Sequence, residues 1–124
     1  MTMRDYRFYN ANPLGAIEKD CVCRAISGAT KIPYESIEDK LHLIAELHDC
    51  DRLCVCCYHR LLEDVFGLKP IYSDGETVGE VASNFKDKIV IIRTNGHLTH
   101  SRYGVIYDTW DCTDCIADVF WVVE

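Results

Sequence analysis

Three residues of this chain carry the side chains of a nucleophilic hydrolase: Cys21, His97 and Asp108. A cysteine thiolate attacks a carbonyl carbon, an imidazole takes the thiol proton, and a carboxylate orients the imidazole. The histidine and the aspartate belong to the segment TNGHLTHSRYGVIYDTWD, residues 94–111. Asn95-Gly96 predicts a tight hairpin turn with positive φ at both residues, and a second turn is predicted around Tyr103. Antiparallel pairing of the two strands after Gly96 places His97 roughly opposite Asp108.

The nucleophile must come from another part of the chain, and Cys21 has a favourable position. Asp20 is a good N-cap residue, so a helix is predicted from about Cys21 to Thr30. Unpaired backbone N–H groups and the positive end of the helix dipole favour a thiolate in the first turn, although the charge of Asp20 opposes them. Cys23 competes for the role, but it lies roughly 200° around the helix and further from the dipole end. We therefore assign Cys21 as the nucleophile and Cys23 to the core.

Two histidines compete for the role of the base. His97 and His100 point to opposite faces of a strand, so only one of them can face the same cleft as Asp108. His97 directly follows a turn, where functional side chains are often displayed by a rigid scaffold. Asp108 lies in a half-buried aromatic strand, where a carboxylate needs a partner. The preferred pair is His97 with Asp108, and Asp111 is the alternative carboxylate.

An oxyanion hole requires two hydrogen-bond donors near the nucleophile. The backbone N–H of Cys21 is one candidate. The side-chain amide of Asn10 or of Asn12 is the candidate for the second. The alternative is that both asparagines only form the turn before Pro13.

The composition limits the partners and the compartment. With 124 residues we expect one domain, residues 1–124. The net charge of −7 and the lack of a basic run argue against nucleic acid and weakly favour a neutral or basic substrate. No apolar run has the roughly 20 residues of a membrane span, and the first residues lack the apolar core of a secretory signal. We expect a cytoplasmic protein of a bacterium or of a phage-infected host cell.

The order of the predicted elements indicates an α+β fold. N-terminal helices should pack on a small C-terminal antiparallel sheet. A second helix begins at Pro33 and has an apolar stripe of Ile37, Leu41, Ile44 and Leu47. Residues 1–19 should form an extended arm. Further helices are expected over 51–66 and from Thr77 to about Phe85, the second with a Thr77–Glu80 capping box. Strands are expected over 88–94, 97–101, 105–110 and 118–123, with a short strand or link over 68–72.

Eight cysteines raise the alternative of a zinc-stabilised interaction module. Structural zinc sites usually use four Cys or His ligands, often from two paired knuckles. The chain has one Cys-x-x-Cys knuckle, and the other group falls on a predicted helix where Cys54 and Cys57 belong to the apolar stripe. We therefore prefer core cysteines and expect neither a metal nor a cofactor. The candidate ligands are His48, Cys50, Cys54, Cys56, Cys57, His59, Cys112 and Cys115.

Several short motifs together resemble small papain-like cysteine peptidase-type proteins, many of which are encoded by phages and mobile elements. The motifs are N-x-N-P, D-C-x-x-R-A, T-V-G-E, G-H and G-x-h-Y-D-T-W-D. The matching residues are Asn10, Asn12, Pro13, Asp20, Cys21, Arg24, Ala25, Thr77 to Glu80, Gly96, His97, Gly104 and Tyr107 to Asp111. The chain departs from the pattern at Cys23 and in having two histidines on one short strand.

The resemblance implies a minimal papain-like fold, in which a nucleophile helix packs on an antiparallel sheet that carries the base. It also implies a triad of Cys21, His97 and Asp108 and hydrolysis of a peptide, amide or protein substrate through an acyl-thioester. The alternative from another class is a non-catalytic binding protein of the same fold, such as a phage factor that acts on a host protein.

Overall fold

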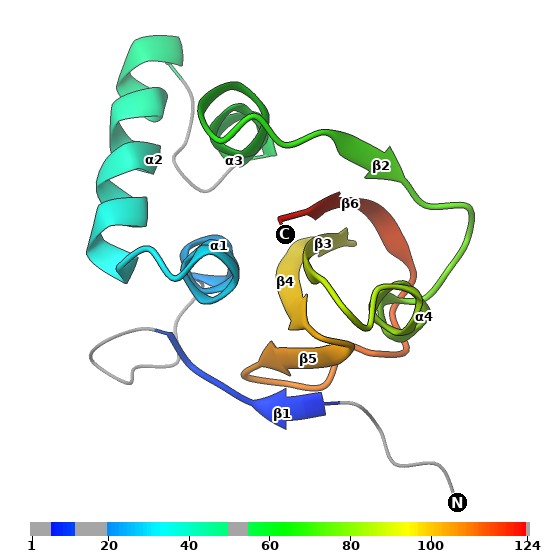
Figure 1. Cartoon of the computed structure of the whole chain (residues 1–124). Coiled ribbons are helices and arrows are strands. Elements are labelled where there is room, and N and C mark those ends of the chain that lie inside the picture. The colour runs from blue at the N-terminus through cyan, green and yellow to red at the C-terminus, as the bar shows by residue number, and fades with distance from the viewer. Residues whose placement is uncertain (1–5, 12–19, 50–54, 124) are drawn as a thin grey trace, which may run out of the picture.

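The computed structural model describes residues 6–11, 20–49 and 55–123, and within them a mixed sheet of six strands carries helices on both faces (Figure 1). The strand order is β1-β5-β4-β3-β6-β2. The strands are β1 (Tyr6–Phe8), β2 (Pro70–Tyr72), β3 (Ile89–Thr94), β4 (His97–Arg102), β5 (Val105–Asp108) and β6 (Ala117–Val122). The helices are α1 (Cys21–Thr30), α2 (Tyr34–His48), α3 (Val55–Arg60), which continues as a π-helical segment over Leu61–Val65, and α4 (Val78–Asn84). This arrangement is the predicted α+β class.

The sheet is larger and less regular than the small C-terminal antiparallel sheet that the sequence predicts. β1 comes from the N-terminal arm and pairs with β5 in parallel, so that Tyr6 lies beside Ile106. β2 pairs antiparallel with β6 at the other edge. Both edge strands have only three residues and no buried face pattern, so their local sequence gives no strong strand signal. Backbone pairing with one neighbour is what makes them strands.

Two tight hairpins connect the three central strands. Thr94 pairs with His97 around Asn95-Gly96, and Arg102 pairs with Val105 around Tyr103-Gly104. The prediction of positive φ at both residues of the first turn is wrong, because only Gly96 has it, at 69°. The second turn has positive φ at both positions, 53° at Tyr103 and 86° at Gly104. The Tyr103 N–H donates to the Lys88 carbonyl, a contact from outside the hairpin that stabilises this turn.

The two faces of the sheet form separate apolar clusters. Helices α1, α2 and α3 cover one face, and α4 covers the other. The alternation along β6 explains this division, because Val119 and Trp121 belong to the first cluster and Phe120 to the second. The predicted capping box of α4 is confirmed, since the Thr77 hydroxyl accepts from the Glu80 N–H and the Glu80 carboxylate accepts from the Thr77 N–H.

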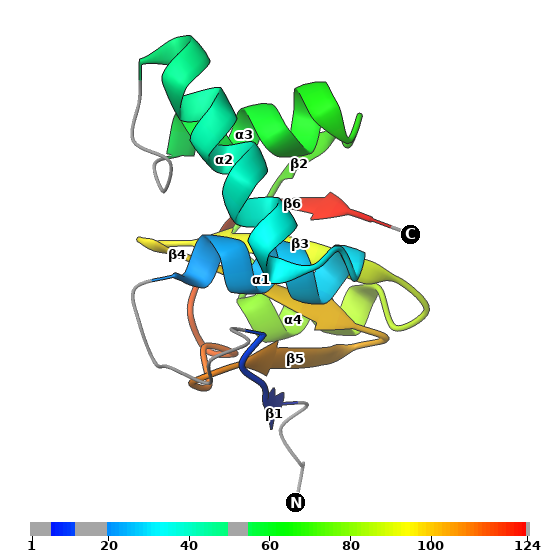
Figure 2. The ribbon, with the colours of Figure 1, turned by 90° about the vertical axis from the view of Figure 1, so that its left-hand side faces the viewer.

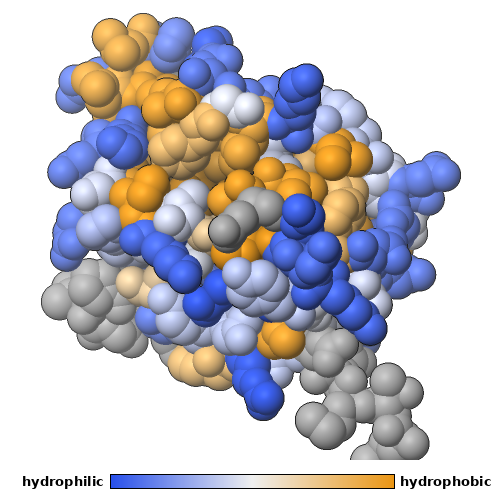
Figure 3. Space-filling model, viewed as in Figure 1, coloured by the Kyte–Doolittle hydropathy of each residue, from blue (hydrophilic) through white to orange (hydrophobic). Residues whose placement is uncertain are grey.

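Helix α2 only partly follows its predicted apolar stripe. Ile37, Leu41 and Ile44 are buried, but Leu47 is 71% exposed. The helix packs on α1 near its start and then runs away from the sheet (Figure 2), so its last turn lies beyond the core. Apolar surface gathers over this end of the helix (Figure 3), where Leu43 is also exposed. Within the described ranges, no helix combines the length and the apolar character needed to cross a bilayer.

The third predicted helix is described only from Val55 onward. The start of its predicted range, residues 51–54, lies outside the described residues. From Val55 the segment is helical as far as Val65, and the predicted terminating residue Gly67 has a φ of 71°. Cys57 is buried as the apolar stripe predicts, whereas Cys56 is exposed.

His100 belongs to the core between β4 and α1. The side chain is 1% exposed, and its ring stacks on Tyr107 with centroids 6.0 Å apart. Burial, together with the positive charge of Arg102, lowers the pKa of His100 to about 3, so the ring is neutral. Gly28 of α1 lies directly against the ring, and an added Cβ would lie 2.4 Å from His100 Cε1. A glycine therefore permits the close packing of α1 on β4.

Gly28→Ala should lower the free energy of unfolding by about 1–3 kcal/mol, because the methyl group overpacks the contact with His100. The sign is diagnostic, since alanine is otherwise preferred over glycine inside a helix by roughly 0.5–1 kcal/mol. Urea unfolding of the purified variants measures the effect. In a His100→Ala background the same substitution should become stabilising. If Gly28→Ala destabilises both backgrounds equally, the contact with the imidazole is not the cause.

Candidate active site

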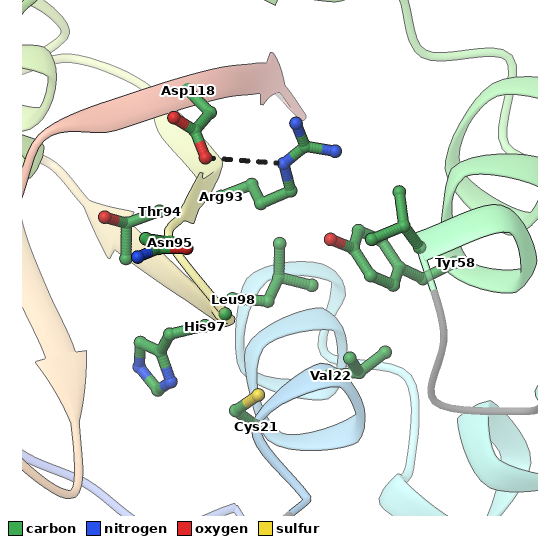
Figure 4. A pocket seen from close by; sticks show the side chains of 11 residues that line it. Cys21, Val22, Tyr58, Arg93, Thr94, Asn95, His97, Leu98 and Asp118 are labelled. Atoms are coloured by element: carbon green, nitrogen blue, oxygen red, sulfur yellow. Dashed lines mark ion pairs between the residues drawn. The ribbon is translucent and has the colours of Figure 1, made fainter.

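The predicted site residues lie where the inner strands β3 and β5 end and where β4 and α1 begin. A cavity of about 470 Å³ opens beside them. In Figure 4, Cys21 and His97 lie along one side of this cavity, and Arg93 and Tyr58 lie across it. The lining residues are Cys21, Val22, Val55, Tyr58, Arg93, Thr94, Asn95, Gly96, His97, Leu98 and Asp118.

His97 and Asp108 are hydrogen-bonded across the β4–β5 hairpin. The distance from His97 Nε2 to Asp108 Oδ2 is 2.6 Å, and both side chains are largely buried. His100 pairs with Tyr107 in the observed register, and extending that register places Asp108 opposite Thr99. His97 lies two residues from Thr99 and therefore on the same face of the strand. The predicted proximity is confirmed, with the two residues diagonal rather than directly opposite.

Cys21 is the first residue of α1, and its side chain lies close enough to His97 to interact with it. Because Nε2 of the imidazole bonds to Asp108, Nδ1 is the ring nitrogen left for the thiol. Burial raises the pKa of the Cys21 thiol, but the hydrogen bonds with His97 and the backbone of Leu98 and the positive charges of His97 and Arg24 outweigh it. The net effect lowers the pKa of Cys21 and favours the thiolate.

The pKa shifts of His97 and Asp108 favour charged forms that stabilise the Cys21 thiolate. Burial lowers the pKa of His97, but hydrogen bonds with Asp108, Cys112 and Cys21 outweigh it and raise the pKa to about 11. Burial raises the pKa of Asp108, and its hydrogen bond and charge interaction with His97 reverse this and lower it. The favoured state is therefore an imidazolium between a thiolate and a carboxylate. Cys23, the rejected alternative, is fully buried in the core, as predicted.

Arg24 connects this group to the helix, and sequence reasoning missed it. Its Nη1 donates to Asp108 Oδ1 at 3.2 Å and to Thr109 Oγ1 at 2.8 Å, while Nε donates to Asp20 Oδ1 at 2.7 Å. The other carboxylate oxygen of Asp20 accepts from the Tyr34 hydroxyl at 2.6 Å. The spacing of four residues between Asp20 and Arg24 on one helix was the signal available in the sequence.

Asp20 occupies the predicted N-cap position of α1, but it does not cap the helix through its side chain. The carboxylate is instead shared between Arg24 and Tyr34. The guanidinium beside it also offsets the negative charge that would otherwise disfavour a thiolate at Cys21.

Cys112 is a second thiol at the site that sequence reasoning assigned only to a possible zinc knuckle. Its Sγ lies 3.8 Å from Asp108 Oδ2, and the side chain is fully buried. The ligand atoms of His97, Asp108 and Cys112 lie within 4.8 Å of one another, the sole such group among the described residues. A zinc ion there would have three protein ligands and would have to separate the bonded His97–Asp108 pair. The local chemistry therefore fits a hydrogen-bonded network better than a metal site.

The candidate ligands of the alternative zinc site are only partly described. Cys50 and Cys54 lie outside the described residues, and Cys57 is disulfide-bonded and so has no thiolate to offer a metal. Cys112 and Cys115 are both free thiols. Cys112 faces His97 and Asp108 and does not form a pair of knuckles with the α3 residues in the described part of the chain.

Two of the three candidate donors for the oxyanion hole, the Cys21 N–H and Asn10, lie within the described residues. The N–H of Cys21 lies at the first position of α1, as predicted. Asn10 follows β1 and is partly exposed, one residue after Tyr9, whose N–H donates to the Asp108 carbonyl at 2.8 Å. Asn12 lies outside the described residues. Asp111, the alternative carboxylate, accepts from the N–H and the hydroxyl of Thr113.

The functional interpretation of the site rests on its geometry, because no similar protein was found that could suggest a function. No protein-family model, no curated protein and no solved structure matches this chain. The papain-like fold and the roles of Cys21, His97 and Asp108 therefore stay predictions that rest on the residues themselves.

Proposed function

We propose that the protein is a cysteine hydrolase of the papain-like peptidase or amidase type. The observation that carries the proposal is the proximity of Cys21 to His97, whose imidazole is hydrogen-bonded to Asp108, beside an open cavity. Cys21 begins a helix of ten residues, His97 begins a strand, and Asp108 ends a strand, so all three are held by regular structure. A thiol with a lowered pKa, a base and an orienting carboxylate are the parts that thiol hydrolysis requires.

In the proposed reaction, the Cys21 thiolate attacks the carbonyl carbon of the substrate, and the proton is held on His97. The tetrahedral oxyanion accepts a hydrogen bond from the Cys21 N–H and from a second donor, for which the side chain of Asn10 or Asn12 is the candidate. His97 then protonates the leaving amine, and the C–N bond breaks to leave a thioester on Cys21. A water molecule that gives a proton to His97 hydrolyses the thioester and restores the thiol.

The buried network gives each residue a defined part. Asp108 holds the imidazole through Nε2, and Arg24 holds Asp108 through Oδ1. Arg24 is therefore a positioning residue and touches no reacting atom. We expect the protein to act in the cytoplasm of a bacterium or of a phage-infected cell, on a peptide, amide or protein substrate.

The pH dependence of alkylation tests the activated thiol. Because the pKa of Cys21 is lowered, its reaction rate with iodoacetamide should fall less from pH 8 to pH 6 than the rate of an ordinary thiol. While the pH is below its pKa of about 8.5, an ordinary thiol reacts roughly tenfold faster for each unit by which the pH rises. Peptide-resolved mass spectrometry after brief labelling measures each cysteine separately in the same sample.

The exposed thiol of Cys56 is the internal comparison. It is the more accessible of the two, so preferential labelling of Cys21 at pH 6 cannot be an effect of accessibility. Equal rates at Cys21 and Cys56 at pH 6, with the same rise toward pH 8, would contradict the proposed hydrolase. The non-catalytic binding protein would then be the better interpretation.

A further inference from the structure

The cavity beside Cys21 has a second polar wall that the hydrolysis chemistry does not use. Arg93 of β3, Tyr58 of α3 and Asp118 of β6 form this wall, with Leu98 between them and Cys21 (Figure 4). A substrate that acylates Cys21 reacts at a residue that lines this cavity. The charges on its far wall therefore bear on substrate choice.

The guanidinium of Arg93 is held in place by a chain of hydrogen bonds. Its Nη1 donates to His59 Nε2 at 3.1 Å. An accepting Nε2 requires a neutral ring that carries its proton on Nδ1, and Nδ1 lies 3.1 Å from Glu63 Oε2. Burial lowers the pKa of His59, in agreement with the neutral ring. The same Glu63 oxygen accepts from Nε1 of the fully buried Trp121 at 3.2 Å, so the chain ends in the core.

The positive charge of Arg93 is only loosely compensated at the cavity. Among the described residues its ion-pair partner is Asp118, whose Oδ2 lies 3.8 Å from Nε and beyond hydrogen-bonding distance. The Asp118 side chain is 45% exposed, so solvent screens this ion pair. The carboxylate of Glu63 is separated from the guanidinium by the neutral ring of His59. A guanidinium has five donors, and its hydrogen bond to His59 leaves others for a ligand.

We propose that Arg93 binds a carboxylate of the substrate, so that the enzyme prefers peptides or amides with an acidic group beside the carbonyl that Cys21 attacks. This inference rests on the proposed hydrolase function. A guanidinium fixed before binding loses little conformational entropy when it meets a carboxylate. The net charge of −7 opposes anionic ligands at long range, but this effect is screened within about 8 Å at physiological salt. The local contact at Arg93 should therefore decide the preference.

Matched electrophiles test the proposal without a known substrate. N-iodoacetyl-glutamate amide and N-iodoacetyl-glutamine amide have side chains of the same length that differ in charge. N-iodoacetyl-lysine amide carries a longer, cationic side chain, and N-iodoacetyl-glutamine carries a free α-carboxylate instead. In each case the Cys21 thiolate displaces iodide and forms a thioether. The rates are measured by mass spectrometry at about 0.15 M salt, where exposed charges are partly screened. Comparison of the two carboxylate reagents distinguishes an acidic side chain from a chain terminus.

At least one carboxylate reagent should label Cys21 about tenfold faster than the neutral one, the size expected for a charge-assisted hydrogen bond. The ratio should fall to about one in Arg93→Met and largely survive in Arg93→Lys. Asp118→Asn should raise the ratio, because it removes a competing carboxylate. A misfolded variant cannot produce that gain.

The outcomes separate the two proposals. If the neutral reagent does not label Cys21 in preference to Cys56, the hydrolase itself is contradicted. If the neutral reagent labels Cys21 rapidly but carboxylate reagents have no advantage, the role of Arg93 is overturned while the hydrolase stands. A preference for the lysine reagent that disappears in Asp118→Asn would also overturn it and would assign the wall to a basic substrate.

Discussion

Replacement of His97 by asparagine should lower the alkylation rate of Cys21 at pH 6 by on the order of tenfold to a hundredfold. The hydrogen bond and the positive charge of His97 are two of the interactions that lower the pKa of Cys21. Without them, burial raises the pKa of the thiol toward or above its ordinary value. At a pKa of about 8.5 only about 0.3% of a thiol is ionised at pH 6.

The loss is smaller than the change in ionisation because a more basic thiolate is a stronger nucleophile. Hydrolysis of a substrate should fall much further. Removing the histidine of a hydrolase triad removes both the base and the acid, and in a serine hydrolase such a change lowers kcat about 10⁶-fold. Labelling of Cys21 and turnover should therefore respond to His97→Asn by very different factors.

His42→Asn is the matched control, because His42 lies on α2 and is exposed. It should leave both the rate and the pH profile of Cys21 unchanged. Circular dichroism and thermal unfolding show whether each variant keeps the fold. An unchanged labelling rate in a folded His97→Asn protein would mean that the imidazole does not activate the thiol.

Arg24→Met should lower the free energy of unfolding at pH 7 by about 3–5 kcal/mol. The guanidinium is 9% exposed and bonds to two buried carboxylates, Asp20 and Asp108. Methionine fills similar space but leaves both carboxylates in the interior without their cation. Urea unfolding followed by fluorescence of the two tryptophans measures the difference.

The pH dependence of this variant has a defined sign. The pKa of Asp108 in the folded protein is lowered from 3.8, so its ionised form stabilises the fold above about pH 4, and this stabilisation is lost as the pH falls. The penalty of Arg24→Met comes from the ionised carboxylates, so the difference from wild type should shrink in acid. Arg60→Met is the control, because the Arg60–Asp64 pair is exposed and 4.0 Å apart and should contribute less than about 0.5 kcal/mol. Equal losses for both arginines would contradict a buried ion network.

Local patterns predicted much of the regular structure. Helix α1 has the predicted bounds, the capping box of α4 is present, and the hairpins fall at the predicted turns. These signals arise between residues at most four positions apart, and neighbouring residues keep such contacts in any fold that contains the element. The proximity of His97 and Asp108 spans eleven positions but also follows from a local signal, because one tight turn sets the register of the two strands that carry them.

Other features depended on partners that a local pattern does not contain. Leu47 has the correct spacing for the stripe of α2, yet it is exposed, and no element within the described residues covers that end of the helix. β1 and β2 exist because β5 and β6 offer them open edges. The positive φ of Tyr103 accompanies a hydrogen bond to Lys88 rather than a preference of tyrosine.

By itself, the sequence determined the class of fold, the helix that begins at Cys21 and the pairing of His97 with Asp108. Only the tertiary structure placed the thiol beside the imidazole, joined Arg24 to Asp108 and brought Cys112 into the same network. Arg24 and Asp108 are 84 residues apart in the chain. Contacts of that separation depend on how helices and strands pack, whereas turns, caps and helix periodicity depend on covalent neighbours.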